Sequence, residues 1–321
     1  MILVLRALGV GDLATAVPAL RGLRAGFPGR ELVLAAPGWL APLVDLVGVV
    51  DRVLPTDGLA DRATWPVPPP EVAVNLHGRG PRSHRMLTAT RPGRLLAFAH
   101  PDAGPAGGPA WDDDEHEVRR WCRLLHWYDL PADPTDLALR RPPATGSPAG
   151  ATVLHPGSKI PAKRWPAERF AALARALTDQ GHRVVLTGSA DERDLAHRVA
   201  REAGLPPDAV LAGRTDLAAL AALVADARLV VSGDTGVAHL ATGYGIASVV
   251  LFGPVPPEHW GPPADRPRHR VLGAGHRVRL DRDRAGAEAT HPRLAAIPVD
   301  EVLAAVGEAE RAVRVSGAVA A

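Results

Sequence analysis

Two short segments of the sequence combine residue types that could bind an anionic substrate. In SGDTGVAHLATGYG, residues 232–245, Asp234 lies between an apolar run and a helical stretch. A helix N-terminus carries unpaired backbone N–H groups and positive dipole charge, so it commonly receives the anion of a ligand. Asp234 could instead be the ordinary N-cap of that helix.

The second segment, HPGSKIPAKRWP (residues 155–166), concentrates positive charge after another apolar run. It contains Ser158, Arg164 and both lysines of the chain, Lys159 and Lys163. Open α/β sheets bind ligands at the carboxyl ends of their strands, and a lysine ammonium there is suited to phosphate. A solvated surface loop is the alternative for any single basic residue.

A third segment, GVGDLA (residues 9–14), matches the glycine fingerprint of dinucleotide-binding turns. The Asp12 carboxylate would repel a diphosphate there, and the nearby acid Glu31 stands at the start of the second predicted strand instead of its end. We therefore expect the turn to present Asp12 toward a cleft. The alternative is that Asp12 is the N-cap of a helix beginning at Leu13.

Composition excludes several protein classes. The chain has 321 residues, 46% hydrophobic and 22% charged, with a net charge of +2. This charge does not require nucleic acid as a partner. The single cysteine, Cys122, excludes an internal disulfide. Without a secretory signal or an uninterrupted apolar run of ~20 residues, we expect a cytoplasmic protein with no transmembrane segment. Peripheral contact with a membrane stays compatible with this expectation.

The elements that must position these residues alternate along the chain, since β-rich runs are followed by helical stretches. The segment RRPPATGSPAG, residues 140–150, interrupts the alternation, which then restarts. The pattern predicts an α/β fold with two doubly wound, Rossmann-like domains, residues 1–145 and 146–321, and a cleft between them. We expect the last helix, residues 300–313, to pack back on the first domain.

Taken together, three segments resemble one enzyme family. VGDLATAVPALRGLRAGFP, VLHPGSKIPAKRWPAERFAAL and VSGDTGVAHLATGYGIASVVLFGPVPPEHWGP occur in the order found in glycosyltransferase family 9, the ADP-heptose heptosyltransferases. EVAVNLHGRGPRSHRML is similar to the acceptor-side loop of that family. The resemblance implies the GT-B fold and inverting transfer, without cofactor or metal, from a nucleoside diphosphate sugar, ADP-heptose in first place. The acceptor would be an envelope glycan or a small natural product.

The resemblance also implies roles for individual residues. Asp12 would be the general base that takes the proton of the acceptor hydroxyl. The residues implied to bind the donor are Ser158, Lys163, Glu192, Asp234, Thr235, Gly236 and His239. On the acceptor side, Gly11, His77, Arg79, Arg82 and Arg85 could meet a phosphorylated or acidic acceptor, and solvated loop charge is their alternative.

Other functions stay open from the sequence. A nicotinamide-dependent oxidoreductase would use the glycine turn, although Asp12 disfavours it. A non-catalytic protein of the same fold that binds nucleotide sugars would not need both Asp12 and Lys163. An aspartic protease is disfavoured, because that chemistry needs two aspartates sharing a proton and the DTG motif occurs once.

Overall fold

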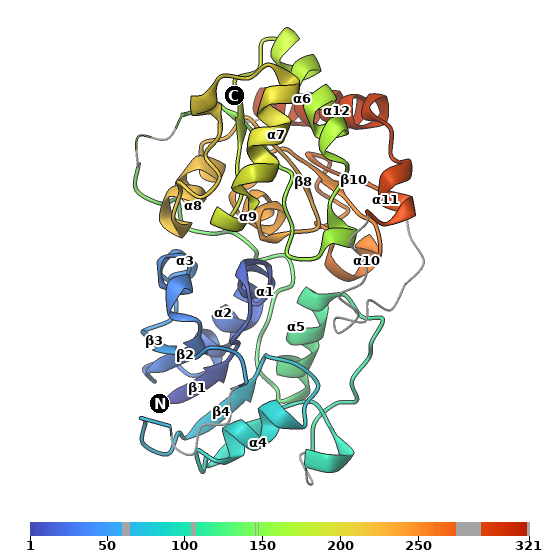
Figure 1. The fold of residues 1–321 in the computed structure, drawn as a ribbon. Coiled ribbons are helices and arrows are strands. Elements are labelled where there is room, and N and C mark those ends of the chain that lie inside the picture. Colours follow the sequence, from blue (N-terminus) through green and yellow to red (C-terminus); the bar gives the residue numbers. More distant parts are fainter. Residues whose placement is uncertain (60–64, 104–106, 145, 147, 274–289, 320–321) are drawn as a thin grey trace. The chain divides into compact units, whose positions relative to one another are not determined.

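The chain forms two units, each built around a five-stranded parallel sheet (Figure 1). The structure is a computed structural model that describes residues 1–59, 65–103, 107–144, 146, 148–273 and 290–319. The units are Met1–Arg140 and Arg141–Ala321, so the division lies at the start of the linker expected from the sequence.

The sheet of the first unit has the order β3-β2-β1-β4-β5. Its strands are β1 (Ile2–Leu5), β2 (Leu32–Ala36), β3 (Arg52–Pro55), β4 (Val72–Asn75) and β5 (Arg94–Leu96). β1, β2 and β4 are buried along their whole length, as expected for parallel strands covered on both faces. From β1 the chain adds β2 and then β3 on one side of the sheet, and it continues with β4 on the opposite side of β1. The carboxyl ends of β1 and β4 are thus neighbours at a topological switch point.

The first helix of the first unit begins and ends at other residues than the sequence predicted. The helices of this unit are α1 (Val10–Thr15), α2 (Val17–Gly26), η1 (Gly38–Leu40), α3 (Ala41–Val47), α4 (Arg82–Thr88), η2 (Pro101–Ala103) and α5 (Glu117–Trp127). The helix expected from Leu13 begins earlier, at Val10, and is interrupted before α2. Pro18 near the start of α2 has no backbone N–H, so one continuous helical ladder cannot run through it.

The second unit has the sheet order β10-β9-β8-β6-β7. Its strands are β6 (Thr152–His155), β7 (Val184–Leu186), β8 (Leu229–Gly233), β9 (Ser248–Leu251) and β10 (His269–Leu272). The apolar segment AVLAG, residues 209–213, forms only an isolated bridge between Leu186 and Val210, although its composition is typical of a strand. The switch point of this sheet lies between β6 and β8, which pair directly.

Helices of the second unit follow its strands in alternation. They are η3 (Pro161–Lys163), α6 (Ala167–Asp179), η4 (Ala190–Glu192), α7 (Arg193–Ala203), η5 (Pro207–Ala209), α8 (Leu217–Ala225), α9 (Gly236–Tyr244), α10 (Pro257–Trp260), α11 (Pro292–Ala296) and α12 (Val299–Val319). In the part of the chain that the structure describes, no helix is both long and apolar enough to cross a lipid bilayer.

The last helix, α12, is part of the second unit. Its buried side chains Val302, Ala305, Val306 and Ala309 form one helical stripe within the core shared by α6, β8 and β9. Glu310 on the same helix accepts a hydrogen bond from Arg228 at 2.6 Å. Its buried face thus packs on the core of the second unit.

Candidate functional site

The predicted anion-binding residues of the second unit meet at the switch point of its sheet. β6 and β8 pair in register through His155 and Ser232, so the loops that follow them leave the sheet side by side. Lys163 at the end of η3 donates a hydrogen bond from Nζ to Asp234 Oδ2 at 2.5 Å. The two side chains are only 17% and 9% exposed, so solvent screens their attraction less than on an open surface.

Asp234, which pairs with Lys163, directly precedes the N-cap of α9. The N-cap of α9 is Thr235 in extended conformation, with no side-chain capping bond. The alternative that Asp234 is the N-cap does not hold, because the cap is the next residue, Thr235, and the Asp234 carboxylate pairs with the ammonium of Lys163. The helix start therefore keeps its backbone N–H groups available at this point.

Thr235 places a hydroxyl at the start of α9. Its Oγ1 is buried and has no hydrogen-bond partner among the described residues. Leaving a buried polar group unsatisfied costs about 1–3 kcal/mol. A ligand oxygen that accepts from this hydroxyl would remove that cost.

The backbones of β8 and η3 approach each other closely. A Cβ atom placed on Gly233 would lie 2.9 Å from the carbonyl oxygen of Lys163. Glycine is needed at the end of β8 because the opposing atom belongs to the backbone and cannot rotate away. This approach brings the loop of Lys163 to Asp234.

Ser158 and Glu192 lie on the same side of this loop. Ser158 is buried, and its Oγ accepts a hydrogen bond from the Ile160 N–H at 3.3 Å, so its own O–H proton is not used in that bond. Glu192 accepts from the Ser189 N–H at 2.8 Å, and its carboxylate lies where a Cβ atom of Gly157 would be. The structure thus brings Glu192 against the loop that carries Ser158 and Lys163.

His239 and Gly236 lie at the beginning of α9, as the sequence predicted. The His239 ring packs edge-on against Trp260 of α10, with 6.0 Å between ring centroids. This packing limits how far the imidazole can turn.

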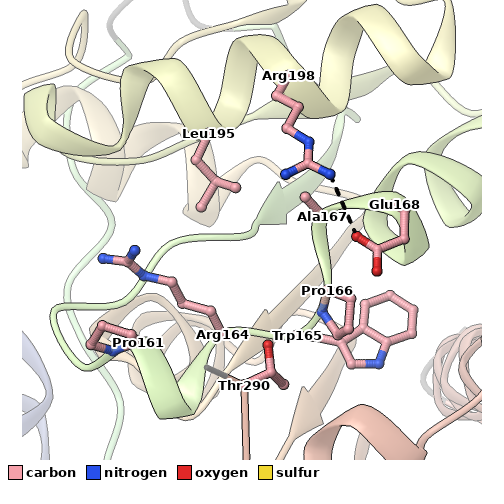
Figure 2. Close-up of a pocket in the computed structure, with 9 residues that line it drawn as sticks. All are labelled: Pro161, Arg164, Trp165, Pro166, Ala167, Glu168, Leu195, Arg198 and Thr290. Atoms are coloured by element: carbon pink, nitrogen blue, oxygen red, sulfur yellow. Dashed lines mark ion pairs between the residues drawn. The ribbon is translucent and has the colours of Figure 1, made fainter. Parts of the chain in front are cut away.

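A separate pocket of about 270 Å³ lies beside the start of α6 (Figure 2). Figure 2 shows Arg198 of α7 turned toward Glu168, with which it forms a 3.8 Å ion pair. The pocket is lined by Pro161, Arg164, Trp165, Pro166, Ala167, Glu168, Leu195, Arg198 and Thr290. None of the predicted donor residues is in this lining, so the pocket differs from the site predicted from the motifs.

In the first unit, Asp12 is the third residue of α1, whose N-cap is Gly9. Its Oδ2 accepts the Gly9 N–H at 3.0 Å, and the side chain is 28% exposed. The alternative that Asp12 is the N-cap does not hold, although its carboxylate accepts a hydrogen bond from the N–H of the N-cap residue Gly9. Gly11 precedes it in the same helix.

The sequence did not point to Arg6, a buried arginine that contacts the backbone of Asp12. Arg6 follows β1 and is 1% exposed. Its guanidinium donates to the Asp12 carbonyl oxygen at 2.8 Å, to Thr15 Oγ1 at 3.1 Å and to Glu117 Oε1 at 3.0 Å. The signal in the sequence was a charged residue directly after a wholly apolar strand. Its partner Glu117 lies far away in the sequence, and local sequence patterns do not predict such a long-range ion pair.

Glu117 is ionised within this cluster. Burial acts to raise the pKa of Glu117, but the guanidinium groups of Arg6 and Arg120 together lower it below its ordinary value. Trp121 adds a hydrogen bond from its indole N–H at 2.9 Å. The buried carboxylate thus accepts hydrogen bonds from three side chains, Arg6, Arg120 and Trp121.

His77 lies directly after β4 and is uncharged. Its Nδ1 accepts a hydrogen bond from the Ala7 N–H at 3.2 Å, which leaves the ring proton on Nε2. Burial and the charge of Arg6 lower the pKa of His77 to about 4, against the opposite influence of Asp12. With its pKa lowered in this way, His77 would meet an acceptor at neutral pH as a neutral N–H donor and not as a cation.

The predicted arginines of the acceptor side are exposed. Arg79 lies in the loop after β4, and Arg82 and Arg85 lie on α4. In the same unit Cys122 is buried in α5, where burial raises the pKa of its thiol to about 12. The described residues contain no group of three or more His, Cys, Asp or Glu arranged to hold a metal ion.

Solved structures with the same paired units define the fold class. The structure of Escherichia coli ADP-heptose lipopolysaccharide heptosyltransferase II matches with a TM-score of 0.74 and 23% identity, over 96% of this chain and 98% of that one. An Escherichia coli heptosyltransferase with ADP matches with a TM-score of 0.71 and 18% identity, over 96% and 99% of the two chains. The protein has the GT-B fold.

Sequence comparison defines the family. The model of glycosyltransferase family 9 (heptosyltransferase) matches residues 110–284. Lipopolysaccharide heptosyltransferase 2 of Escherichia coli is 33% identical over 153 residues, which are 46% of this chain and 43% of that relative. The aligned segment thus spans less than half of that relative. The chain belongs to glycosyltransferase family 9.

Proposed function

We propose that the protein is an inverting glycosyltransferase that moves a sugar, heptose in first place, from a nucleoside diphosphate to an acceptor hydroxyl. The observation that carries the proposal is the Lys163–Asp234 pair beside the Thr235 hydroxyl at the start of α9, which has no hydrogen-bond partner among the described residues. ADP-heptose is the proposed donor, since a structural neighbour is named as an ADP-heptose heptosyltransferase.

The donor diphosphate would bind at the start of α9. The N–H groups of Thr235 and Gly236, the Thr235 hydroxyl and the Ser158 hydroxyl are hydrogen-bond donors for its oxygens. Lys163 would supply a fixed positive charge, held in place by Asp234. These groups would stabilise the charge that develops on the leaving diphosphate, so the proposal requires no metal ion. The Glu192 carboxylate would accept from a hydroxyl of the nucleoside part.

Transfer needs one base on the acceptor side. Asp12, partly exposed and next to a neutral His77, would take the proton as the acceptor oxygen bonds to the anomeric carbon. The bond from that carbon to the phosphate oxygen breaks, and the diphosphate leaves with the electron pair. A single in-line displacement inverts the anomeric configuration. The acceptor would be an envelope glycan or a small natural product, and Arg79 and Arg82 would meet its acidic groups.

Nucleotide binding tests the proposal directly. The purified protein is titrated calorimetrically with ADP, UDP, GDP, dTDP and NAD, once with a chelator and once with Mg²⁺. Selective binding of ADP, equal in both conditions, supports an ADP-sugar donor bound without a metal. Preference for another nucleoside diphosphate would change the donor, and tight binding of NAD alone would favour the oxidoreductase.

A further inference from the structure

One buried guanidinium joins the two loops that carry the acceptor-side residues. Arg6 Nε donates to the carbonyl oxygen of Asp12 itself at 2.8 Å. Its Nη1 donates to the carbonyl oxygen of Leu76, the residue before His77. The backbone at both functional side chains is therefore fixed by the same cation, across the switch point of the first sheet.

Arg6 lies closer to the carboxylate of Glu117 than to that of Asp12. Its Nη2 is 3.0 Å from Glu117 Oε1 but 3.8 Å from Asp12 Oδ1. Glu117 is 5% exposed and also accepts from Trp121 and Arg120, so it is held rigidly in the first turn of α5. Glu117 takes the short ion pair, while the carboxylate of Asp12 accepts the Gly9 N–H and stays partly exposed.

This difference matters for a general base. A carboxylate bound in a short pair by a buried arginine has its oxygens occupied by N–H donors and is less available to a substrate proton. With Glu117 as its counterion, Arg6 can orient the Asp12 backbone without occupying the Asp12 carboxylate. The guanidinium thus orients the backbone of Asp12 through a hydrogen bond, while its charge is paired with Glu117.

We propose that Glu117 is a positioning residue for the acceptor side: by pairing with Arg6 it holds the backbone at Asp12 and His77 in place and keeps the Asp12 carboxylate out of a short ion pair with Arg6. This inference rests on the proposed role of Asp12 as base. In Glu117→Gln, the uncompensated Arg6 is expected to draw Asp12 Oδ1 into a short ion pair, which pulls the carboxylate toward Arg6 and weakens the hydrogen bond that Oδ2 accepts from the Gly9 N–H. Glu115→Gln is the matched control, because Glu115 pairs with Arg123 at 2.7 Å near the same end of α5.

The first test needs no acceptor. The amide proton signal of Gly9 is recorded by NMR in the full-length wild type, Glu117→Gln and Glu115→Gln. We expect an upfield shift of this signal only in Glu117→Gln, since the bond to a carboxylate is weakened. A folded Glu117→Gln with the wild-type Gly9 signal would overturn the proposal.

Thr15→Val covers the case in which Glu117→Gln does not fold. Thr15 Oγ1 accepts from Arg6 and donates to the Asp12 carbonyl at 3.0 Å, and valine preserves its shape. We expect Thr15→Val to shift the Gly9 signal in the same direction by a smaller amount. The wild-type signal in this variant would then overturn the proposal.

The second test measures ADP release from ADP-heptose with heptose-free lipopolysaccharide as acceptor, together with ADP affinity. We expect kcat to fall on the order of 10- to 100-fold in Glu117→Gln while the Kd of ADP stays unchanged, because a small displacement of a catalytic group has such effects. Glu117→Asp, which keeps the charge, should recover part of kcat. Asp12→Asn is run in parallel. Wild-type turnover of Asp12→Asn would overturn the base role, whereas its inactivity beside a fully active Glu117→Gln would overturn only the positioning role.

Discussion

The two lysines of the chain provide a matched pair of single-residue tests. Lys163 is mostly buried and paired with Asp234, whereas Lys159 in the same loop is exposed. We predict that Lys163→Ala weakens ADP binding on the order of 10- to 100-fold, the usual worth of a hydrogen bond to a charged group. Lys159→Ala should leave the Kd of ADP unchanged in calorimetric titration. Equal losses in both variants would mean that the loop attracts ADP only by its total charge.

Asp12 is the second residue with a specific prediction. In Asp12→Asn the side-chain carbonyl can still accept the Gly9 N–H, so the turn should keep its shape. The variant cannot take a proton, and we expect the rate of ADP release from ADP-heptose in the presence of acceptor to fall on the order of 10²- to 10⁴-fold. ADP affinity should be unchanged. Retained turnover would remove Asp12 from the proposed mechanism.

Sequence reasoning identified the motif residues but not all of their local roles. Lys163 and Asp234 were predicted as parts of one site, and the structure pairs them. The alternatives that made Asp12 and Asp234 helix N-caps do not hold, since the caps are Gly9 and Thr235. Which residue caps a helix depends on backbone angles and on partners such as Lys163. Arg6 and Glu117 were missed because they are joined across a wide sequence separation, which no periodicity reports.

At the scale of elements, the approach of β8 to η3 makes a prediction about Gly233. Alanine there would place its Cβ 2.9 Å from the Lys163 carbonyl oxygen and push η3 away from the strand. We expect Gly233→Ala to destabilise the protein by about 1–3 kcal/mol, as overpacking does, and to weaken ADP binding. Gly107→Ala is the control, since a Cβ atom at Gly107 meets nothing within 4 Å. Both are measured by chemical unfolding and calorimetry, and equal stabilities would contradict the close approach.

The alternation of strands and helices was predictable, because buried parallel strands and amphipathic helices have different periods. Pro18 indicates the interruption before α2, but the sequence interpretation did not take this proline into account. The destination of α12 was not predictable, since its apolar stripe fits any complementary surface and only the assembled core of the second unit selects one. AVLAG has strand composition, yet only Val210 pairs with a neighbour, through Leu186.

At the scale of the whole molecule, buried histidines predict a pH-dependent stability. Burial lowers the pKa of His77 in the first unit and of His269 in the second to about 4, from an ordinary value of 6.5. Between these values the unfolded chain binds more protons than the folded one. The free energy of unfolding should therefore decrease as pH falls from 6.5 toward 4.

Denaturant unfolding across this pH window checks the prediction. His269→Gln removes one of the two groups and should make the decrease shallower, with His77→Gln doing the same for the first unit. The same slope in the variant lacking both histidines would show that other groups cause the loss of stability.

The gathering of both lysines in one loop has a practical consequence for chemical labelling. An amine-directed acylating reagent can modify only Lys159, Lys163 and the terminal amine of this chain. Lys159 should react as an exposed amine, while Lys163 is shielded by its partner and should react slowly. If the diphosphate binds as proposed, ADP should slow modification of Lys163 further and leave Lys159 unaffected. Mass spectrometry of the acylated peptide would then report occupancy of the donor site without any substituted residue, and equal protection of both amines would argue against it.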